Sequence, residues 1–158
     1  MAIPIINDWE KFFDNPHEGL GSSYERIVLN ELLLATANKY EARNVLESPS
    51  FGFTGISGIN LFALADSGLE VTLEDDNPRR LELIRNLWHT MDLSFTARHN
   101  PDFRRLDYPD RAFDLSFSFS ALWFVPDLKA FLSELSRVTA KAIFISVPRW
   151  ARFAARSR

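Results

Sequence analysis

Five short segments of strand-like composition alternate with helical patterns over residues 44–147, and this alternation constrains the fold more than any other feature. The segments cover residues 44–47, 70–74, 93–98, 113–119 and 141–147. Strands separated by helices of about 10–15 residues indicate βαβ units and therefore a parallel sheet. We expect an α/β fold with a doubly wound, mainly parallel sheet of order 3-2-1-4-5, flanked by helices.

The remaining segments predict the helices and the limits of the domain. Helical spacing or helix-start signals mark residues 7–13, 22–40, 58–67, 77–91 and 127–138. The chain then divides into an N-terminal helical appendage or lid over 1–41, a core over 42–148 and a basic tail over 149–158. The last strand, from Ala142 to Val147, is nearly all apolar, which predicts burial on both of its faces.

Composition excludes several classes of protein. The absence of cysteine excludes a disulfide scaffold, a thiolate metal site and a cysteine nucleophile. The net charge of −3 argues against nucleic acid as a partner, although the four arginines after Val147 could contact phosphate, lipid or an acidic protein, or could simply be solvated. The longest uncharged stretch, residues 48–65, is too polar to span a membrane, and the N-terminus lacks an export signal. We therefore expect no membrane contact and a cytoplasmic location.

The glycine-rich loop after the first predicted strand is a candidate ligand site. In doubly wound sheets, ligands bind beyond the carboxyl ends of the strands. The first strand ends at Glu47, and Gly52, Gly55 and Gly58 follow at every third position. Such glycines either allow a ligand to approach the backbone closely or form an ordinary turn. Their spacing is not that of the dinucleotide-binding fingerprint, which argues against a nicotinamide-dependent oxidoreductase.

Acidic residues follow the next two strands as well. Asp75 and Asp76 follow the second strand, where a carboxylate can accept both ribose hydroxyls or can stabilise the start of the next helix. Asp102 and Phe103 follow the third strand. That pair could bind the amino group and the ring of adenine, or could belong to a charged surface loop.

These segments together resemble the class I S-adenosylmethionine-dependent methyltransferases. Residues 45–47, the glycine loop, residues 70–75 and Asn77-Pro78 look like motif I of that family and the strand that follows it. The run Leu-Asp-Tyr-Pro-Asp-Arg-Ala-Phe-Asp-Leu at 106–115 looks like the family's L-P-F-x-D-x-x-F-D stretch. The resemblance covers about residues 45–148.

The resemblance implies S-adenosylmethionine as the cofactor and assigns roles to residues by position. It implies that Glu47 anchors the methionine amino group, that Asp75 holds the ribose hydroxyls and that Asp76 lies beside the adenine. It further implies that Asp102 accepts from the adenine amino group, that Phe103 flanks the ring and that Ser118 lies near the methionine end. The glycines implied to shape the loop under the cofactor are Gly52, Gly55 and Gly58.

The sequence departs from the family pattern in two places. Pro49, Phe51 and Phe53 stand in the loop where the family carries its glycine-rich run. The family's final two strands are missing, because only eleven residues follow Val147. The strand from Ala142 to Val147 then lies at an edge of the sheet and needs a cover. A second copy, a partner subunit, the arginine tail or a missing C-terminal portion could provide it, and we expect a homodimer or a heteromer.

No catalytic group stands out, so the catalytic residue is unknown at this level. Methyl transfer from a sulfonium depends chiefly on placing the acceptor against the methyl group. His99, Trp123 and His17 are weak candidates, each of which could instead be a loop or core residue. The histidines stand mostly apart from acids, which predicts no metal site. The expected function is methyl transfer to an unidentified small-molecule acceptor. The alternative is a non-catalytic methyltransferase-like subunit, or a truncated domain, that binds a protein partner.

Overall fold

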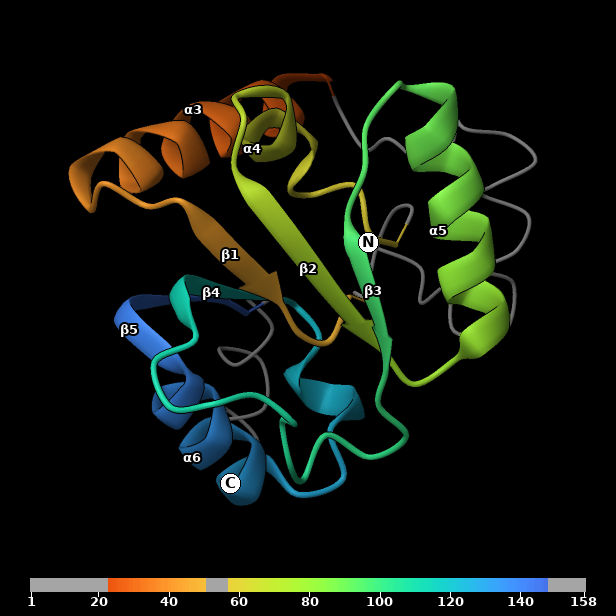
Figure 1. Cartoon of the computed structure of the whole chain (residues 1–158), viewed down its shortest axis with the longest axis vertical. Helices are drawn as coiled ribbons and strands as arrows, with labels where there is room; N and C mark the ends of the chain where they lie inside the picture. The colour runs from red at the N-terminus through yellow and green to blue at the C-terminus, as the bar shows by residue number, and fades with distance from the viewer. Residues whose placement is uncertain (1–22, 51–56, 148–158) are drawn as a thin grey trace, which may run out of the picture.

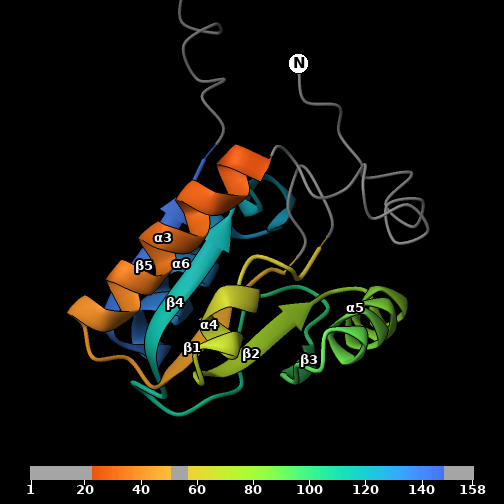
Figure 2. The same ribbon diagram turned by 90° about the horizontal axis from the view of Figure 1, so that it is seen from above.

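Five parallel strands form a single sheet in the order β3-β2-β1-β4-β5 (Figure 1). The computed structural model describes residues 23–50 and 57–147. The strands are β1 (Asn44–Glu47), β2 (Glu70–Asp75), β3 (Thr96–His99), β4 (Phe113–Phe119) and β5 (Thr139–Ser146). Every neighbouring pair is parallel, and Figure 2 shows β2 and β4 pointing in the same direction. The predicted fold class and strand order are confirmed.

Helices cover the two faces of this sheet because successive side chains of each strand point to opposite faces. Val45 belongs to one apolar cluster, together with residues of α3 (Ser23–Lys39), α4 (Phe62–Asp66) and α5 (Pro78–Thr90). Leu46 belongs to the other, together with residues of α6 (Leu128–Val138). The sheet is therefore sandwiched between α3, α4 and α5 on one side and α6 on the other.

Helix α5 begins where the sequence predicts it. The side chain of Asn77 accepts hydrogen bonds from the backbone N–H groups of Arg79 and Arg80, and Pro78 occupies the first helical position. This arrangement satisfies two donors that would otherwise lack partners at the helix start. The inward side chains of Ile84 and Trp88 are fully or almost fully buried.

Helix α4 is shorter than predicted. The sequence predicts a helix over residues 58–67, but α4 spans Phe62–Asp66. Residues 58–61 form turns instead, because Gly58 has a φ of +74° and Phe62 N–H donates to the carbonyl of Ile59, three residues back. The predicted end is correct, since Gly68 has a φ of +92°.

The limits of β3 and the burial of β5 also differ from the prediction. Residues 93–95 do not join β3, because Leu93 and Phe95 pack into the apolar cluster of α5 instead. Among the described residues, strand β5 has β4 as its one neighbour, as an edge strand does. The prediction that it is buried on both faces is wrong: Ile143 and Ile145 are 38% and 41% exposed. The opposite face of β5 packs against the core, through Ala142 and Phe144.

The remaining predicted segments lie outside the described residues. They are the helix over residues 7–13, most of the N-terminal appendage, and the basic tail over residues 149–158.

Candidate functional site

The loop after β1 is tied to the carboxyl end of β2 by three hydrogen bonds. Ser48 Oγ donates to Glu74 Oε2 over 2.8 Å. Ser50 donates twice, from its backbone N–H to the Glu74 carbonyl over 2.6 Å and from its Oγ to Asp75 Oδ2 over 2.7 Å. These bonds bring the ends of the two strands together, so the side chains that follow β1 and β2 share one edge of the sheet.

Glu47 ends β1 at the centre of that edge. Its register partners are Leu73 in β2 and Phe117 in β4, and its side chain is fully buried. Oε1 accepts a hydrogen bond of 2.7 Å from Asn60 Nδ2, which lies in the turns before α4. A carboxylate is thus held in place below the loop.

Asp75 ends β2, and groups of the protein surround its carboxylate. Oδ1 accepts from the Asn77 backbone N–H over 2.8 Å and from Arg80 Nη2 over 2.6 Å. Oδ2 accepts from Ser50 Oγ over 2.7 Å and from Arg80 Nε over 2.9 Å. Both Asp75 and Arg80 are buried, so this is an internal, bidentate ion pair.

Asp76 follows directly and has a different environment. Its side chain is 45% exposed, and Oδ1 pairs with the same Arg80 Nη2 over 2.6 Å. Partial burial and then the nearby charge of Asp75 raise the pKa of the Asp76 carboxyl above its ordinary value. The Asp76 carbonyl lies 3.0 Å from His99 Nε2, which links the ends of β2 and β3.

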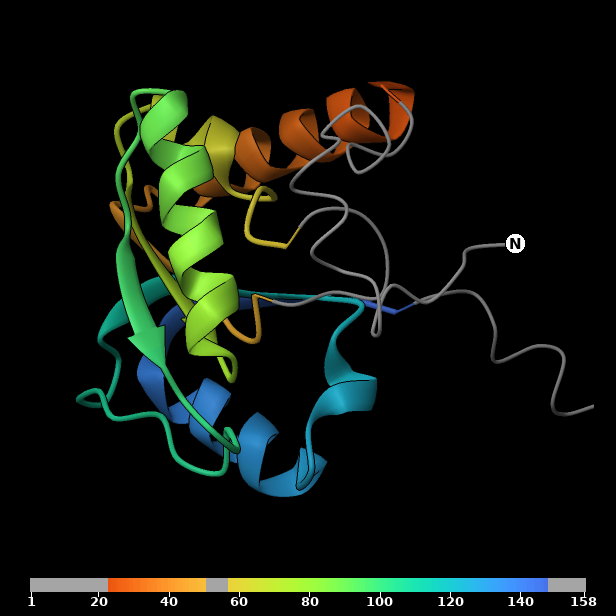
Figure 3. The ribbon, with the colours of Figure 1, turned by 90° about the vertical axis from the view of Figure 1, so that its right-hand side faces the viewer.

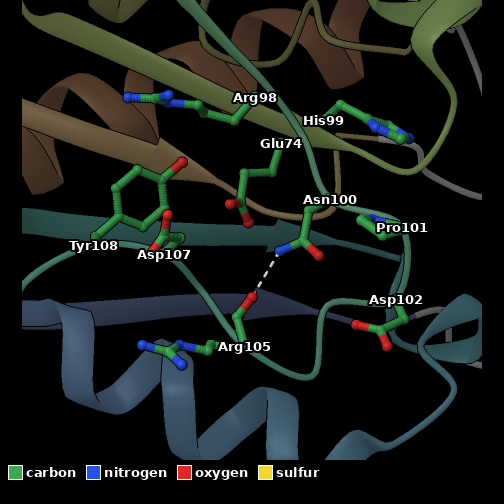
Figure 4. A pocket seen from close by; sticks show the side chains of 9 residues that line it. All are labelled: Glu74, Arg98, His99, Asn100, Pro101, Asp102, Arg105, Asp107 and Tyr108. Atoms are coloured by element: carbon green, nitrogen blue, oxygen red, sulfur yellow. Dashed lines mark hydrogen bonds between the residues drawn. The ribbon is translucent and has the colours of Figure 1, made fainter.

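A polar cavity of about 550 Å³ lies beside these strand ends (Figure 4). Figure 4 shows the Glu74 carboxylate between Tyr108 and Asn100. Glu74 is almost fully buried, and that burial raises its pKa in spite of the hydrogen bond from Ser48. Burial and the neighbouring Glu74 raise the pKa of the Tyr108 hydroxyl. Arg98 and Arg105 also line this cavity.

The two predicted adenine-binding residues lie in different environments. Asp102 lines the cavity, is 47% exposed and accepts a hydrogen bond from the Arg104 backbone N–H. Phe103 is buried, and its ring packs edge-on against Phe131 with the centroids 6.3 Å apart. The structure therefore places Asp102 at the edge of the sheet and the Phe103 side chain in the core under α6. The role that the resemblance implies for Phe103 stays a prediction.

The glycine at 58 is required by helix packing. A Cβ atom there would lie 2.7 Å from Ile84 Cγ2 of α5, and the Gly58 carbonyl accepts a hydrogen bond of 2.7 Å from Trp88 Nε1. The close approach of α5 thus accounts for Gly58 without any ligand. Gly52, Gly55 and His17 lie outside the described residues.

The remaining candidates surround the end of β4. Ser118 is fully buried, and its Oγ has no hydrogen-bond partner within the described ranges. Trp123 lies in the short 3-10 helix η1 (Leu122–Phe124), which follows the end of β4 (Figure 3). Its side chain is 62% exposed, so it is not a core residue. His99, at the end of β3, is exposed.

The comparison with protein families identifies the domain. Residues 53–145, more than half of the chain, match the family described as "Methyltransferase domain". The chain belongs to this family. The match supports S-adenosylmethionine use by the methyltransferase domain at the level of the family. A comparison with curated proteins found no match.

Solved structures with the same fold include methyltransferases. The PH0226 protein from Pyrococcus horikoshii OT3 is 20% identical, with a TM-score of 0.66, over 93% of this chain and 65% of that chain. An S-adenosylmethionine-dependent methyltransferase from Clostridium acetobutylicum is 14% identical, with a TM-score of 0.62, over 85% and 54%. A complex of the Haloferax volcanii Trm112 methyltransferase activator with a methyltransferase is 27% identical, with a TM-score of 0.54, over 66% and 44%. This methyltransferase domain therefore spans between about half and two thirds of the length of these relatives.

The methyltransferase domain brings four of the predicted carboxylates to one edge, at the ends of β1, β2 and β3. They are Glu47, Asp75, Asp76 and Asp102. Sequence reasoning missed the groups that hold them, above all Ser50, Asn60 and Arg80. Arg80 could have been found, because it stands four residues after Asp76, a spacing at which helical ion pairs form.

Among the described residues, no three side chains of histidine, cysteine, aspartate or glutamate gather as metal ligands. Over the same residues, no helix is long and apolar enough to cross a membrane.

Proposed function

We propose that this methyltransferase domain binds S-adenosylmethionine at the carboxyl edge of the sheet and transfers its methyl group to a small-molecule acceptor. The observation that carries the proposal is the position of the acids within a domain of this family. Glu47, the Asp75–Asp76 pair and Asp102 end or follow three adjacent strands. Ligands of doubly wound sheets bind beyond these strand ends.

The donor and acceptor groups at this edge fit such a ligand. S-adenosylmethionine carries an ammonium group, two ribose hydroxyls and an adenine amino group, all of which donate hydrogen bonds. The edge offers carboxylates, which accept them. We assign Glu47 to the ammonium group, one acid of the Asp75–Asp76 pair to the ribose and Asp102 to the adenine. Ser118, whose buried Oγ has no partner in the part of the chain that the structure describes, is assigned to the methionine end.

The protein's contribution to the reaction is mainly placement. The cofactor, when bound, supplies a methyl group on a positively charged sulfur, which is already activated for displacement. The chain must then orient an acceptor and exclude water, and it needs a base only where the acceptor loses a proton. His99, at the end of β3, is the proposed base in that case, because an imidazole nitrogen can accept a proton from an acceptor placed beside it. The exposed Trp123 is proposed to cover the acceptor.

Calorimetric titration with S-adenosylmethionine and, separately, S-adenosylhomocysteine tests the proposal. We expect micromolar binding of at least one of them by the folded protein. Glu47→Gln should weaken binding by about ten-fold, as the loss of a charge-assisted hydrogen bond implies. Glu82→Gln, which alters an exposed pair with Arg79, is the matched control. Absence of binding by a folded sample would contradict the proposal.

A second candidate function follows from the exposed side of β5. On this edge strand Ile143 and Ile145 are 38% and 41% exposed, and Val147, directly after it, is 59% exposed. Such a surface suits a methyltransferase-like subunit that binds a protein partner without catalysing a reaction. A stable hetero-complex without affinity for either cofactor form would favour this candidate. The cytoplasmic location expected from the sequence remains a prediction.

A further inference from the structure

The acceptor capacity of Asp75 is filled from inside the protein. An ionised carboxylate offers about four acceptor positions. Arg80 takes two of them, and Ser50 Oγ and the Asn77 backbone N–H take the other two, at distances of 2.6–2.9 Å. The Asp75 side chain is fully buried. A ligand hydroxyl therefore finds no open position on this carboxylate.

Displacing one of these donors is unfavourable. Arg80 has only 6% of its side chain exposed, so a ligand that took its place on Asp75 would separate a buried guanidinium from the buried carboxylate that it pairs with. Breaking a buried ion pair costs more free energy than one hydroxyl–carboxylate hydrogen bond returns. Asp75 is for this reason a poor acceptor for the hydroxyls that the family resemblance assigns to it.

The Asp76 carboxylate, unlike that of Asp75, is accessible to a ligand. Its side chain is 45% exposed, and among the described residues its carboxylate accepts a hydrogen bond from Arg80 Nη2 to Oδ1 over 2.6 Å. The same Nη2 atom holds Asp75 Oδ1 over 2.6 Å. Its backbone is also fixed, since its carbonyl lies 3.0 Å from His99 Nε2. Arg80 is thus anchored by the buried Asp75 carboxylate and at the same time orients the accessible Asp76 carboxylate.

We infer that Asp76 accepts the ribose hydroxyls of the nucleoside ligand, and that Arg80 is a positioning residue that holds Asp75 inward and Asp76 at the edge. The inference rests on the proposed function, binding of S-adenosylmethionine. It changes which of the two acids contacts the ligand and gives a role to an arginine that the sequence pattern did not single out.

A cycle of ligand and protein changes tests the inference. The ligands are S-adenosylhomocysteine and its 2′-deoxy and 3′-deoxy analogues, and the measurement is calorimetric affinity. For the unaltered protein, removing a bonded hydroxyl should weaken binding by about ten-fold. In Asp76→Asn the loss of affinity on removing a ribose hydroxyl should fall to about two-fold or less, because the charged acceptor is gone. In Asp75→Asn the ten-fold loss on removing a ribose hydroxyl should persist. The decisive variant is Asp76→Asn, whose exposed side chain makes it compatible with folding.

Variants of Arg80 distinguish its role in positioning Asp76 from a general contribution to the stability of the fold. Arg80→Met should reduce the dependence on the hydroxyls although Asp76 is still present, and Arg80→Lys should restore part of it by keeping the charge. Arg79→Met is the matched control, because Arg79 is 58% exposed and forms an ion pair with Glu82 on the surface of α5. The control should bind all three ligands as the unaltered protein does.

The results distinguish a failure of this inference from a failure of the proposed function. Loss of the hydroxyl dependence in Asp75→Asn, together with its retention in Asp76→Asn, would overturn this inference and leave the proposed function standing. Equal binding of the three ligands by the unaltered protein would do the same. An unaltered, folded protein that binds none of them would overturn the proposed function and the inference together.

Discussion

Glu74, on β2, is 2% exposed, and the burial of its carboxyl group makes the stability of the protein depend on pH. Burial raises its pKa above the ordinary value of 4.5, against the opposing effects of Ser48, Tyr108, Asn100 and Arg98. A raised pKa in the folded state means that the unfolded chain ionises more readily. Glu74 therefore contributes stability below about pH 4.5 that is lost as the pH rises through the folded-state pKa.

The variant Glu74→Gln should lack this pH dependence. Glutamine stays uncharged and can still accept the hydrogen bond from Ser48, so its stability relative to the unaltered protein should rise as the pH increases from 4 to 7. Urea unfolding at several pH values measures the difference. Glu82→Gln, at an exposed position, should give a curve parallel to that of the unaltered protein. Parallel curves for Glu74→Gln as well would show that the burial of this carboxyl has no effect on stability.

Arg79 and Arg80 are neighbours in the sequence with opposite environments, and they allow a matched comparison. Arg80→Met should lower the free energy of unfolding by about 3 kcal/mol or more, because it leaves the buried Asp75 carboxylate without its counter-ion. Arg79→Met should change it by about 0.5 kcal/mol or less, because its pair with Glu82 is exposed. Chemical denaturation measures both. Equal effects would mean that the pair with Asp75 contributes no more than a surface pair.

At the scale of the elements, the sequence predicts strands and helices well and their limits less well. Strand β1, strand β4 and the start of α5 follow from local patterns of apolar residues and helix caps, so they were predictable. The limits of α4 and β3 depend on how side chains pack in three dimensions, as in the contact of Phe95 with Trp88, whose ring centroids lie 4.8 Å apart. The bond from Arg80 to Asp75 was beyond prediction for the same reason, since both side chains must be placed in space.

The contact of the loop with α5 gives a prediction at this scale. Gly58→Ala should destabilise the protein by about 2–3 kcal/mol, because its Cβ would lie 2.7 Å from Ile84 and its φ of +74° disfavours any side chain. Gly68→Ala has a φ of +92° but open space around the Cβ, so it should cost only about 1 kcal/mol. Urea denaturation of the two variants separates steric overlap from backbone strain. A larger loss for Gly68→Ala would contradict this account.

At the scale of the whole molecule, the two edges of the sheet are unlike. Strand β3 carries Arg98 and His99, and its residues are mostly exposed and polar. Strand β5 presents Ile143 and Ile145 to solvent. Polar or charged side chains protect an edge strand from pairing with another chain, whereas an apolar edge invites it. We therefore propose that association occurs through β5, as a homodimer or a heteromer.

Size-exclusion chromatography with light scattering tests this proposal. We expect the unaltered protein to elute as a dimer or to form a stable complex with a partner, and the variant Ile143→Lys/Ile145→Lys to elute as a monomer that has lost the partner. Charged side chains at these two positions would have to be desolvated in any contact that covers β5, which opposes association. Met91→Lys is the control, because Met91 is 56% exposed at the end of α5, away from β5. A monomer with no partner, or association that persists in the double variant, would show that β5 is not the contact surface.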